Sequence, residues 1–191
     1  MKLAIGLASL CLASCAAVQS GAPAPAPSAA RENRITLYFG QRSLDEDDWS
    51  PVEDQPMFGV EFAQEKPGSA IGWEVGLQGS YDDDTVAGFD VEGSTSELYG
   101  GVKKSFLEGS VHPYVGGGLA FINGSVEVSG VGDDDDTSPA AYAHGGVDFA
   151  VSELVHLGLD LRILFGSELT IAGVDGDADY GQLALTLGFA F

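Results

Sequence analysis

Cysteine is almost absent from this chain of 191 residues. The two cysteines, Cys11 and Cys15, both lie within the first fifteen positions, so a disulfide framework and a cysteine-bound zinc site are excluded from the rest of the chain. Positive charge is scarce as well, because 8 lysines and arginines stand against 29 acidic residues, for a formal net charge of −21. Nucleic acid would repel such a chain, and we exclude it as a partner.

The apolar run near the start, Leu3–Ala13, is too short to span a bilayer as a helix. It follows Lys2 and leads into Leu12-Ala13-Ser14-Cys15, so residues 1–14 are predicted to be a signal peptide that is removed on export. The last four residues resemble the lipobox of bacterial lipoproteins, where cleavage precedes the cysteine and its thiol is acylated. This resemblance implies a lipid on Cys15. An ordinary signal peptide, cut after Ala16 or Ala17, is the alternative.

Residues 15–33 are rich in alanine and proline and are predicted to be an extended linker. From Arg34 onward, apolar residues alternate with polar or small ones. Eight segments of roughly ten residues show this alternation, and that is the length of a membrane-spanning β-strand. Their apolar positions lie within 35–39, 58–62, 71–77, 98–102, 115–121, 147–149, 155–163 and 183–191.

The connections between these segments alternate in length. Three are short (64–69, 104–111 and 151–154), and four are long (43–56, 82–96, 123–139 and 166–179). Short periplasmic turns, long extracellular loops and an even number of strands are typical of bacterial outer-membrane barrels. We therefore predict an all-β fold over 34–191, an eight-stranded antiparallel up-and-down transmembrane β-barrel with both ends in the periplasm.

A soluble lipocalin-like barrel would also alternate, with its apolar face inward. Here the apolar faces carry no charge, whereas the other face has glycine, alanine and charges of both signs, which favours a lipid-facing exterior and a filled lumen. Aromatic residues are expected in two girdles. The periplasmic girdle would hold Phe62, Trp73, Phe149 and Phe191, and the outer one Phe39, Phe58, Phe121 and Phe165.

Three stretches resemble the small outer-membrane β-barrel family that includes the OmpA transmembrane domain, OmpX and opacity-type surface proteins. They are His112–Phe121 (HPYVGGGLAF), Gly145–Phe149 (GGVDF) with Leu157–Arg162 after it, and the last strand, whose terminal Phe191 resembles the insertion signal of such barrels. The resemblance implies a protein of the Gram-negative cell outer membrane, in contact with its lipids. It says little about function, since these barrels serve many purposes.

The four long segments contain 20 of the 29 acidic residues and no lysine or arginine. Divalent cations are possible partners of this surface, but a solvated, repulsive surface is the interpretation we favour. Asp175–Asp179 is similar to a calcium loop, yet the glycine and glutamate that an EF-hand needs are replaced by Tyr180 and Thr186. The acidic residues are Asp45, Glu46, Asp47, Asp48, Glu53, Asp54, Asp82, Asp83, Asp84, Asp90, Glu92, Glu127, Asp133, Asp134, Asp135, Asp136, Glu168, Asp175, Asp177 and Asp179.

The lumen is predicted to hold a network of charges of both signs, which must pair or meet water. We interpret this network as a structural plug, in preference to a gate. No metal site and no cofactor is predicted. The expected members of the network are Arg42, Glu61, Glu74, Glu97, Lys103, Asp148, Asp160 and Arg162.

An enzyme on this barrel would need a nucleophile or base held by an orienting group. Of the three histidines, His112 and His156 fall near the periplasmic ends, and His144 points inward but is followed by two glycines. We therefore predict a monomeric, non-enzymatic outer-membrane barrel with a structural or surface-interaction role. A narrow ion-conducting pore, a lipid-modifying enzyme and a soluble periplasmic lipocalin-like lipoprotein remain as alternatives.

Overall fold

The computed structural model describes residues 33–65, 71–86, 88–106, 110–130 and 132–191. The predicted signal peptide, Cys15 and the linker up to residue 32 lie outside the described residues. Within the described part, no helix is long and apolar enough to cross a membrane.

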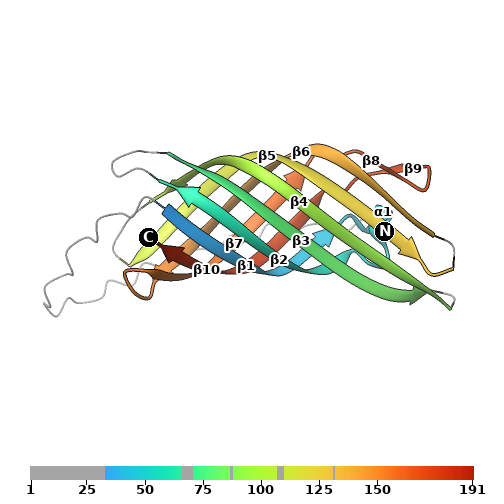
Figure 1. The fold of residues 1–191 in the computed structure, drawn as a ribbon, viewed down its shortest axis with the longest axis horizontal. Helices are drawn as coiled ribbons and strands as arrows, with labels where there is room; N and C mark the ends of the chain where they lie inside the picture. Colours follow the sequence, from blue (N-terminus) through green and yellow to red (C-terminus); the bar gives the residue numbers. More distant parts are fainter. Residues whose placement is uncertain (1–32, 66–70, 87, 107–109, 131) are drawn as a thin grey trace, which may run out of the picture.

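Eight antiparallel strands close into a barrel, which confirms the predicted fold class (Figure 1). Following the barrel wall, the order is β1, β10, β7, β6, β5, β4, β3, β2. The strands are β1 (Asn33–Leu44), β2 (Asp54–Gln64), β3 (Gly72–Val86), β4 (Phe89–Ser105), β5 (Val111–Val128), β6 (Gly132–Ala150), β7 (Val155–Phe165) and β10 (Tyr180–Ala190). Three small elements complete the chain: α1 (Glu46–Trp49) and the hairpin of β8 (Leu169–Ile171) and β9 (Val174–Gly176).

Pairing of the first and last strands closes the sheet. The β1–β10 register runs from Arg34 opposite Ala190 to Leu44 opposite Tyr180. Closure matters in lipid, because an open sheet edge would leave backbone N–H and C=O groups without partners. The barrel can therefore expose its outer wall to hydrocarbon.

Side chains are distributed in the opposite way to a soluble barrel, which keeps its apolar residues inside. On β7, the outward Leu157, Leu159, Leu161 and Ile163 are exposed, whereas the inward-facing residues between them are buried. The same alternation holds along β10, whose inward side presents Gln182, Ala184 and Thr186. An apolar exterior over a polar interior is the arrangement that a membrane barrel requires.

The apolar exterior ends at a sharp boundary toward the extracellular end of the barrel. Outward positions change from apolar to polar within one pleat on four strands: Phe39 to Gln41, Leu98 to Ser96, Phe121 to Asn123, and Pro139 to Thr137. Phe39 packs on Phe58 with ring centroids 5.2 Å apart. At the opposite end, Phe62 packs on Trp73 at 5.3 Å and on Phe191 at 6.5 Å. These contacts agree with an aromatic girdle at each boundary.

Two of the four predicted long loops are in fact strand. The segment 82–96 continues β3 and β4 in register up to Val86 opposite Phe89, and 123–139 continues β5 and β6 up to Val128 opposite Gly132. Backbone hydrogen bonds between strands do not need apolar side chains. The strands therefore continue beyond the point where the apolar alternation ends at the membrane. Consequently, β3 to β6 project well beyond β1, β2, β7 and β10 in Figure 1.

The other two predicted loops fold over the barrel mouth. Trp49 of α1 is 4 % exposed, and its indole Nε1 donates to the carbonyl oxygen of Asp177 at 2.7 Å. It belongs to an apolar cluster with Ile122, Leu164 and Leu169, and residues 43–56 and 166–179 thereby supply an apolar cover. We call α1 together with the β8–β9 hairpin the lid.

Acidic side chains attach the lid hairpin to the projecting part of β6. Asp136 Oδ2 accepts the backbone N–H of Thr170 at 2.8 Å, and Asp134 Oδ2 accepts that of Ala172 at 2.6 Å. Asp136 also accepts the N–H of Thr137, and these backbone hydrogen bonds lower the pKa of its carboxyl group. Part of the acidic run 133–136 therefore has a structural role.

Because the pKa of Asp136 is lowered in the folded state, its contribution to hairpin docking is present above the ordinary aspartate pKa of about 3.9 and is lost as the pH falls through the lowered value. We expect Asp136→Ala to reduce protection of the Thr170 amide several-fold near neutral pH. Hydrogen exchange of the folded protein measures this, with Asp133→Ala, an exposed neighbour on the same strand, as the control. Equal protection in both variants would contradict the docking role.

Candidate functional site in the barrel lumen

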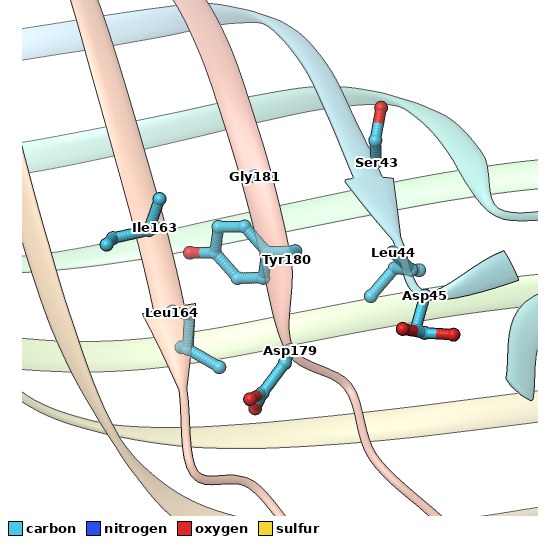
Figure 2. A pocket seen from close by; sticks show the side chains of 8 residues that line it. All are labelled: Ser43, Leu44, Asp45, Ile163, Leu164, Asp179, Tyr180 and Gly181. Atoms are coloured by element: carbon cyan, nitrogen blue, oxygen red, sulfur yellow. The ribbon is translucent and has the colours of Figure 1, made fainter. Parts of the chain in front are cut away.

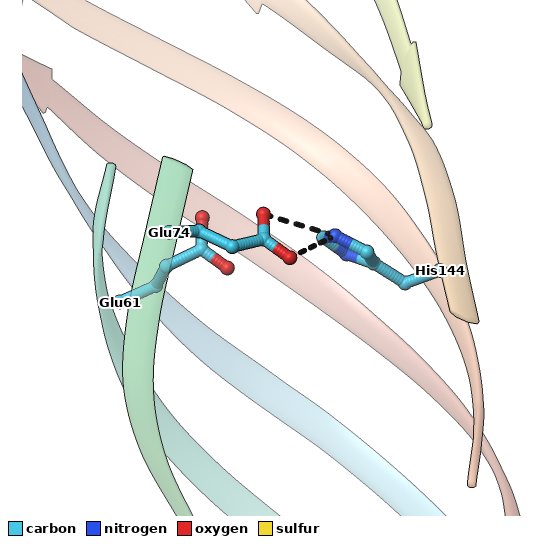
Figure 3. Close-up of side chains that lie close together, drawn as sticks. All are labelled: Glu61, Glu74 and His144. Carbon is cyan, nitrogen blue, oxygen red and sulfur yellow. Dashed lines mark hydrogen bonds and ion pairs between the residues drawn. The ribbon is translucent and has the colours of Figure 1, made fainter. Parts of the chain in front are cut away.

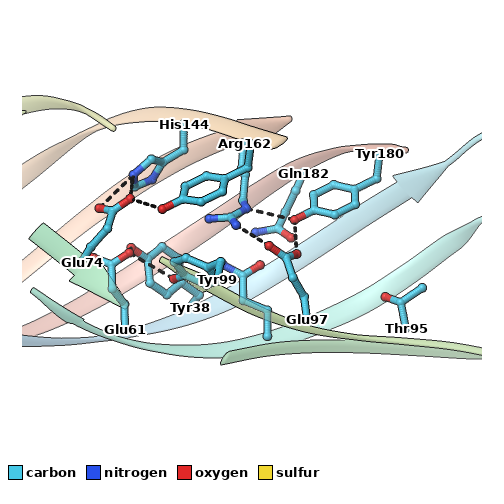
Figure 4. Close-up of polar contacts among 12 residues, drawn as sticks. Tyr38, Glu61, Glu74, Thr95, Glu97, Tyr99, His144, Arg162, Tyr180 and Gln182 are labelled. Atoms are coloured by element: carbon cyan, nitrogen blue, oxygen red, sulfur yellow. Dashed lines mark hydrogen bonds and ion pairs between the residues drawn. The ribbon is translucent and has the colours of Figure 1, made fainter. Parts of the chain in front are cut away.

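All eight charged residues predicted for the lumen point into the barrel, and each is at most 5 % exposed. They form two clusters and a peripheral pair. The Glu97 cluster consists of Arg42, Glu97, Arg162 and Tyr180, and the His144 cluster of Glu61, Glu74, Lys103, His144 and Asp160. Figure 4 shows members of both clusters along the lumen, with Glu61, Glu74 and His144 beside Glu97, Arg162 and Tyr180.

Glu97 on β4 is the shared acceptor of the first cluster. Arg42 Nη2 lies 3.2 Å from Glu97 Oε2, Arg162 Nη2 donates to Glu97 Oε1, and the Tyr180 hydroxyl donates to Oε2 at 2.5 Å. Strands β1, β4, β7 and β10 are therefore joined across the barrel through one carboxylate. Arg42 and Arg162 are 0 % and 2 % exposed, so this pairing takes place away from solvent.

Aromatic rings hold the two guanidinium groups in place. The Cζ atom of Arg42 lies 3.9 Å from the centre of the Tyr180 ring. That of Arg162 lies 4.0 Å from the Tyr99 ring and 3.9 Å from the Tyr142 ring. Stacking of this kind suits the planar, weakly hydrated guanidinium better than it would a lysine ammonium.

The second cluster is centred on a histidine between two carboxylates. His144 Nε2 lies 3.0 Å from Glu74 Oε1, and His144 Nδ1 lies 2.9 Å from Asp160 Oδ2. Lys103 Nζ pairs with Glu61 Oε1 at 2.8 Å. In the described part of the chain, Glu61, Glu74 and His144 are the one group of three potential metal-ligating side chains whose ligand atoms all lie within 4.8 Å of one another.

Asp148 does not join either cluster. It lies toward the periplasmic end, where Arg34 Nη1 contacts Asp148 Oδ2 at 2.5 Å with partial solvent access. The sequence pattern predicts Arg34 at the start of the first strand, but it does not predict Arg34 as a member of the charge network. The His112 and His156 rings pack at the same end, with centroids 5.6 Å apart.

Five inward tyrosines are the residues that sequence reasoning missed. Each hydroxyl donates to a buried carboxylate, as Tyr142 does to Glu74 at 2.7 Å and Tyr114 to Asp160 at 2.8 Å. Their strand parity could have identified them, since each shares the alternation phase of the polar residues on its own strand. The five are Tyr38, Tyr99, Tyr114, Tyr142 and Tyr180.

A groove of about 350 Å³ opens on the outer wall where β1 and β7 end and β10 begins (Figure 2). Ser43, Asp45 and Asp179 line it beside the apolar Ile163. Ser43 Oγ donates to Asp54, and Asp179 accepts from Ser167 and from the Gly166 N–H. No histidine lines this groove, and the Ser43 hydroxyl is bound to the carboxylate of Asp54.

A family model described as outer membrane protein beta-barrel domain matches residues 8–191. The chain belongs to this family. It is accordingly a protein of the outer membrane, as predicted. A comparison with curated proteins finds no match.

Three solved structures share the fold. Ail, the attachment invasion locus protein of Yersinia pestis, is similar at a TM-score of 0.60 and 13% identity, over 85% of this chain and 99% of that chain. A major outer membrane protein from Thermus thermophilus gives 0.60 and 13%, over 85% and 100%. Neisserial surface protein A gives 0.57 and 15%, over 83% and 96%. At such low identity these similarities show the fold alone.

Removing the charge of Glu97 should destabilise the barrel strongly, because two buried guanidinium groups would lose their carboxylate. We expect Glu97→Gln to lower the free energy of unfolding by about 3–5 kcal/mol. Glu92→Gln, an exposed acid on the same strand, should change it by less than about 0.5 kcal/mol. Equilibrium unfolding in lipid vesicles, followed by heat-dependent gel mobility, compares the two. Similar losses for both variants would refute the role of Glu97.

Proposed function

We propose that this protein is a closed, non-enzymatic outer-membrane barrel whose acidic extracellular part is an interaction surface for cationic partners. The observation that carries the proposal is the filled lumen. Large side chains from several strands, including Arg42, Arg162, Tyr38 and Tyr99, are at most 2 % exposed inside it. An eight-stranded barrel has room for little more than its own side chains.

The lid adds a second closure above the charged clusters. Its Trp49 and Leu169 pack in one cluster with Ile122 of β5, and each of the three is at most 4 % exposed. An ion crossing the barrel would have to displace this apolar layer and then break the pairing of Arg42 and Arg162 with Glu97. These two layers argue against a narrow ion-conducting pore.

The inward histidine is an unsuitable catalytic base. Both ring nitrogens of His144 contact carboxylates, those of Glu74 and Asp160, and neither contacts a serine or threonine hydroxyl. The residue is also enclosed, at 6 % exposure. A lipid-modifying enzyme would need its base next to a nucleophile and open to the membrane. This supports a non-enzymatic role.

The projecting strands carry the surface that we assign to interaction. Their outward positions include the exposed Asp83, Asp90, Glu92, Asp133 and Asp135. No lysine or arginine occurs in the described parts of 43–56, 82–96, 123–139 and 166–179. Such a surface produces a negative field that attracts cations and basic segments of other molecules. A monomer surrounded by outer-membrane lipids is sufficient for this role.

The proposal is tested with the folded chain in lipid vesicles and a fluorescent oligolysine peptide as probe. We expect binding that weakens as ionic strength rises from about 0.01 M to about 0.15 M, where the Debye length falls from about 30 Å to about 8 Å. Replacing Asp83, Asp90 and Glu92 together by their amides should weaken it several-fold. Replacing Glu65 and Glu153, at the ends of the short periplasmic connections, should not.

An oligoglutamate peptide serves as the negative probe, and planar bilayers containing the same protein should show no current steps. Oligolysine binding whose affinity changes neither with ionic strength nor with the triple substitution would contradict the surface role. Discrete conductance steps would contradict the closed lumen.

A further inference from the structure

We propose that Glu61, Glu74 and His144 form a buried site for one divalent transition-metal ion of the zinc class. Figure 3 shows the three side chains pointing toward one another from β2, β3 and β6. One ligand atom of each lies within 4.8 Å of those of the other two. A histidine nitrogen with two carboxylate oxygens is a donor set that Zn²⁺ accepts.

The histidine is already oriented for this task. Its Nδ1 lies 2.9 Å from Asp160 Oδ2, while its Nε2 faces Glu74 Oε1 and Oε2 at 3.0 and 3.2 Å. A metal-bound histidine usually donates its second ring N–H to a carboxylate, which fixes the tautomer and the ring plane. Asp160 would be that carboxylate, and the Tyr114 hydroxyl holds it at 2.8 Å.

The backbone leaves room beside the ligand atom. Gly116 on β5 lies against His144, and a Cβ atom there would collide with the Nε2 and Cδ2 atoms of the ring. Any larger residue would push the imidazole away from Glu74. Gly116 therefore permits the approach of His144 to the carboxylates.

Two further observations support a cation in this cluster. Asp160 is 1 % exposed, and its Oδ1 has no hydrogen-bond partner among the residues that the structure describes. When Nε2 binds an ion, the imidazole is neutral, and the cluster then sets three carboxylates against the single ammonium of Lys103. Buried charges of one sign are costly unless they are compensated, and one divalent ion would compensate the remaining two.

A metal ion could replace the Lys103 ammonium at the Glu61 carboxylate. Its Nζ contacts Glu61 Oε1 at 2.8 Å but also lies 4.1 Å from the centre of the Tyr114 ring. The other oxygen, Glu61 Oε2, accepts the hydroxyls of Tyr38 and Tyr99, which keep the carboxylate in position. The ion would bind Oε1, and the ammonium would remain over the ring.

The nitrogen ligand and the enclosure select against Ca²⁺ and Mg²⁺. Calcium takes six to eight oxygens, and magnesium keeps several waters. The acidic residues of the extracellular part offer oxygen ligands only. Excess Mg²⁺ therefore saturates the outer surface while leaving the lumen site to a transition metal.

The experiment uses the full chain, folded in detergent micelles and dialysed against Co²⁺ in excess Mg²⁺. We expect a single tightly held Co²⁺ per barrel by elemental analysis, with the absorption of a cobalt ion bound to nitrogen and oxygen. His144→Gln and Glu74→Gln should lose it, and Asp160→Asn should weaken it by about 10–100-fold. Replacing His112 and His156 together by glutamine should leave it unchanged.

Heat-dependent gel mobility confirms that each variant is folded. Should His144→Gln not fold, the unchanged chain still decides: Zn²⁺ should raise its unfolding temperature above that measured with a chelator. The proposal is overturned by a barrel that retains no Co²⁺ in Mg²⁺, by an unfolding temperature indifferent to Zn²⁺ and chelator, or by loss of the ion on changing His112 and His156.

Discussion

The pairing of charges inside the barrel is the constraint on which the rest of this structure depends. Lipid outside the wall requires apolar side chains at every second position, so the polar positions of all eight strands must face one narrow lumen. There Glu97 receives Arg42, Arg162 and Tyr180, drawn from three other strands. These charged groups are compensated by partners that are distant in sequence, and their contacts tie opposite sides of the wall together.

The filled lumen also separates the periplasmic end of the barrel from the extracellular end. Paired charges fill the lumen, and the lid closes its extracellular end with the buried Trp49. What remains available to the surroundings is the acidic extension of β3 to β6. Some of its carboxylates are themselves structural, since Asp134 and Asp136 accept backbone N–H groups of the lid hairpin. The extracellular carboxylates thus hold the lid in place as well as producing the negative field.

The sequence predicted the barrel well because membrane strands repeat every two residues, as Leu157 to Ile163 shows. The same parity assigned Arg42, Glu97 and Arg162 to the lumen. Partners could not be predicted, because they depend on register: His144 meets Glu74, 70 residues away, and Asp160, 16 residues away. Two further features could not be predicted. The strands continue beyond the apolar alternation, and the lid has no periodic signal, because its Trp49 contacts Asp177, 128 residues away.

The most direct test of the account is a double-mutant cycle between Glu97 and Arg162. The free energy of unfolding in vesicles would be measured for Glu97→Gln, Arg162→Met and the two combined. If paired lumen charges hold the barrel together, the combined loss should fall short of the sum of the single losses by about 1–3 kcal/mol. Losses that add to within about 0.5 kcal/mol would show that the two side chains act independently, and would contradict the central claim.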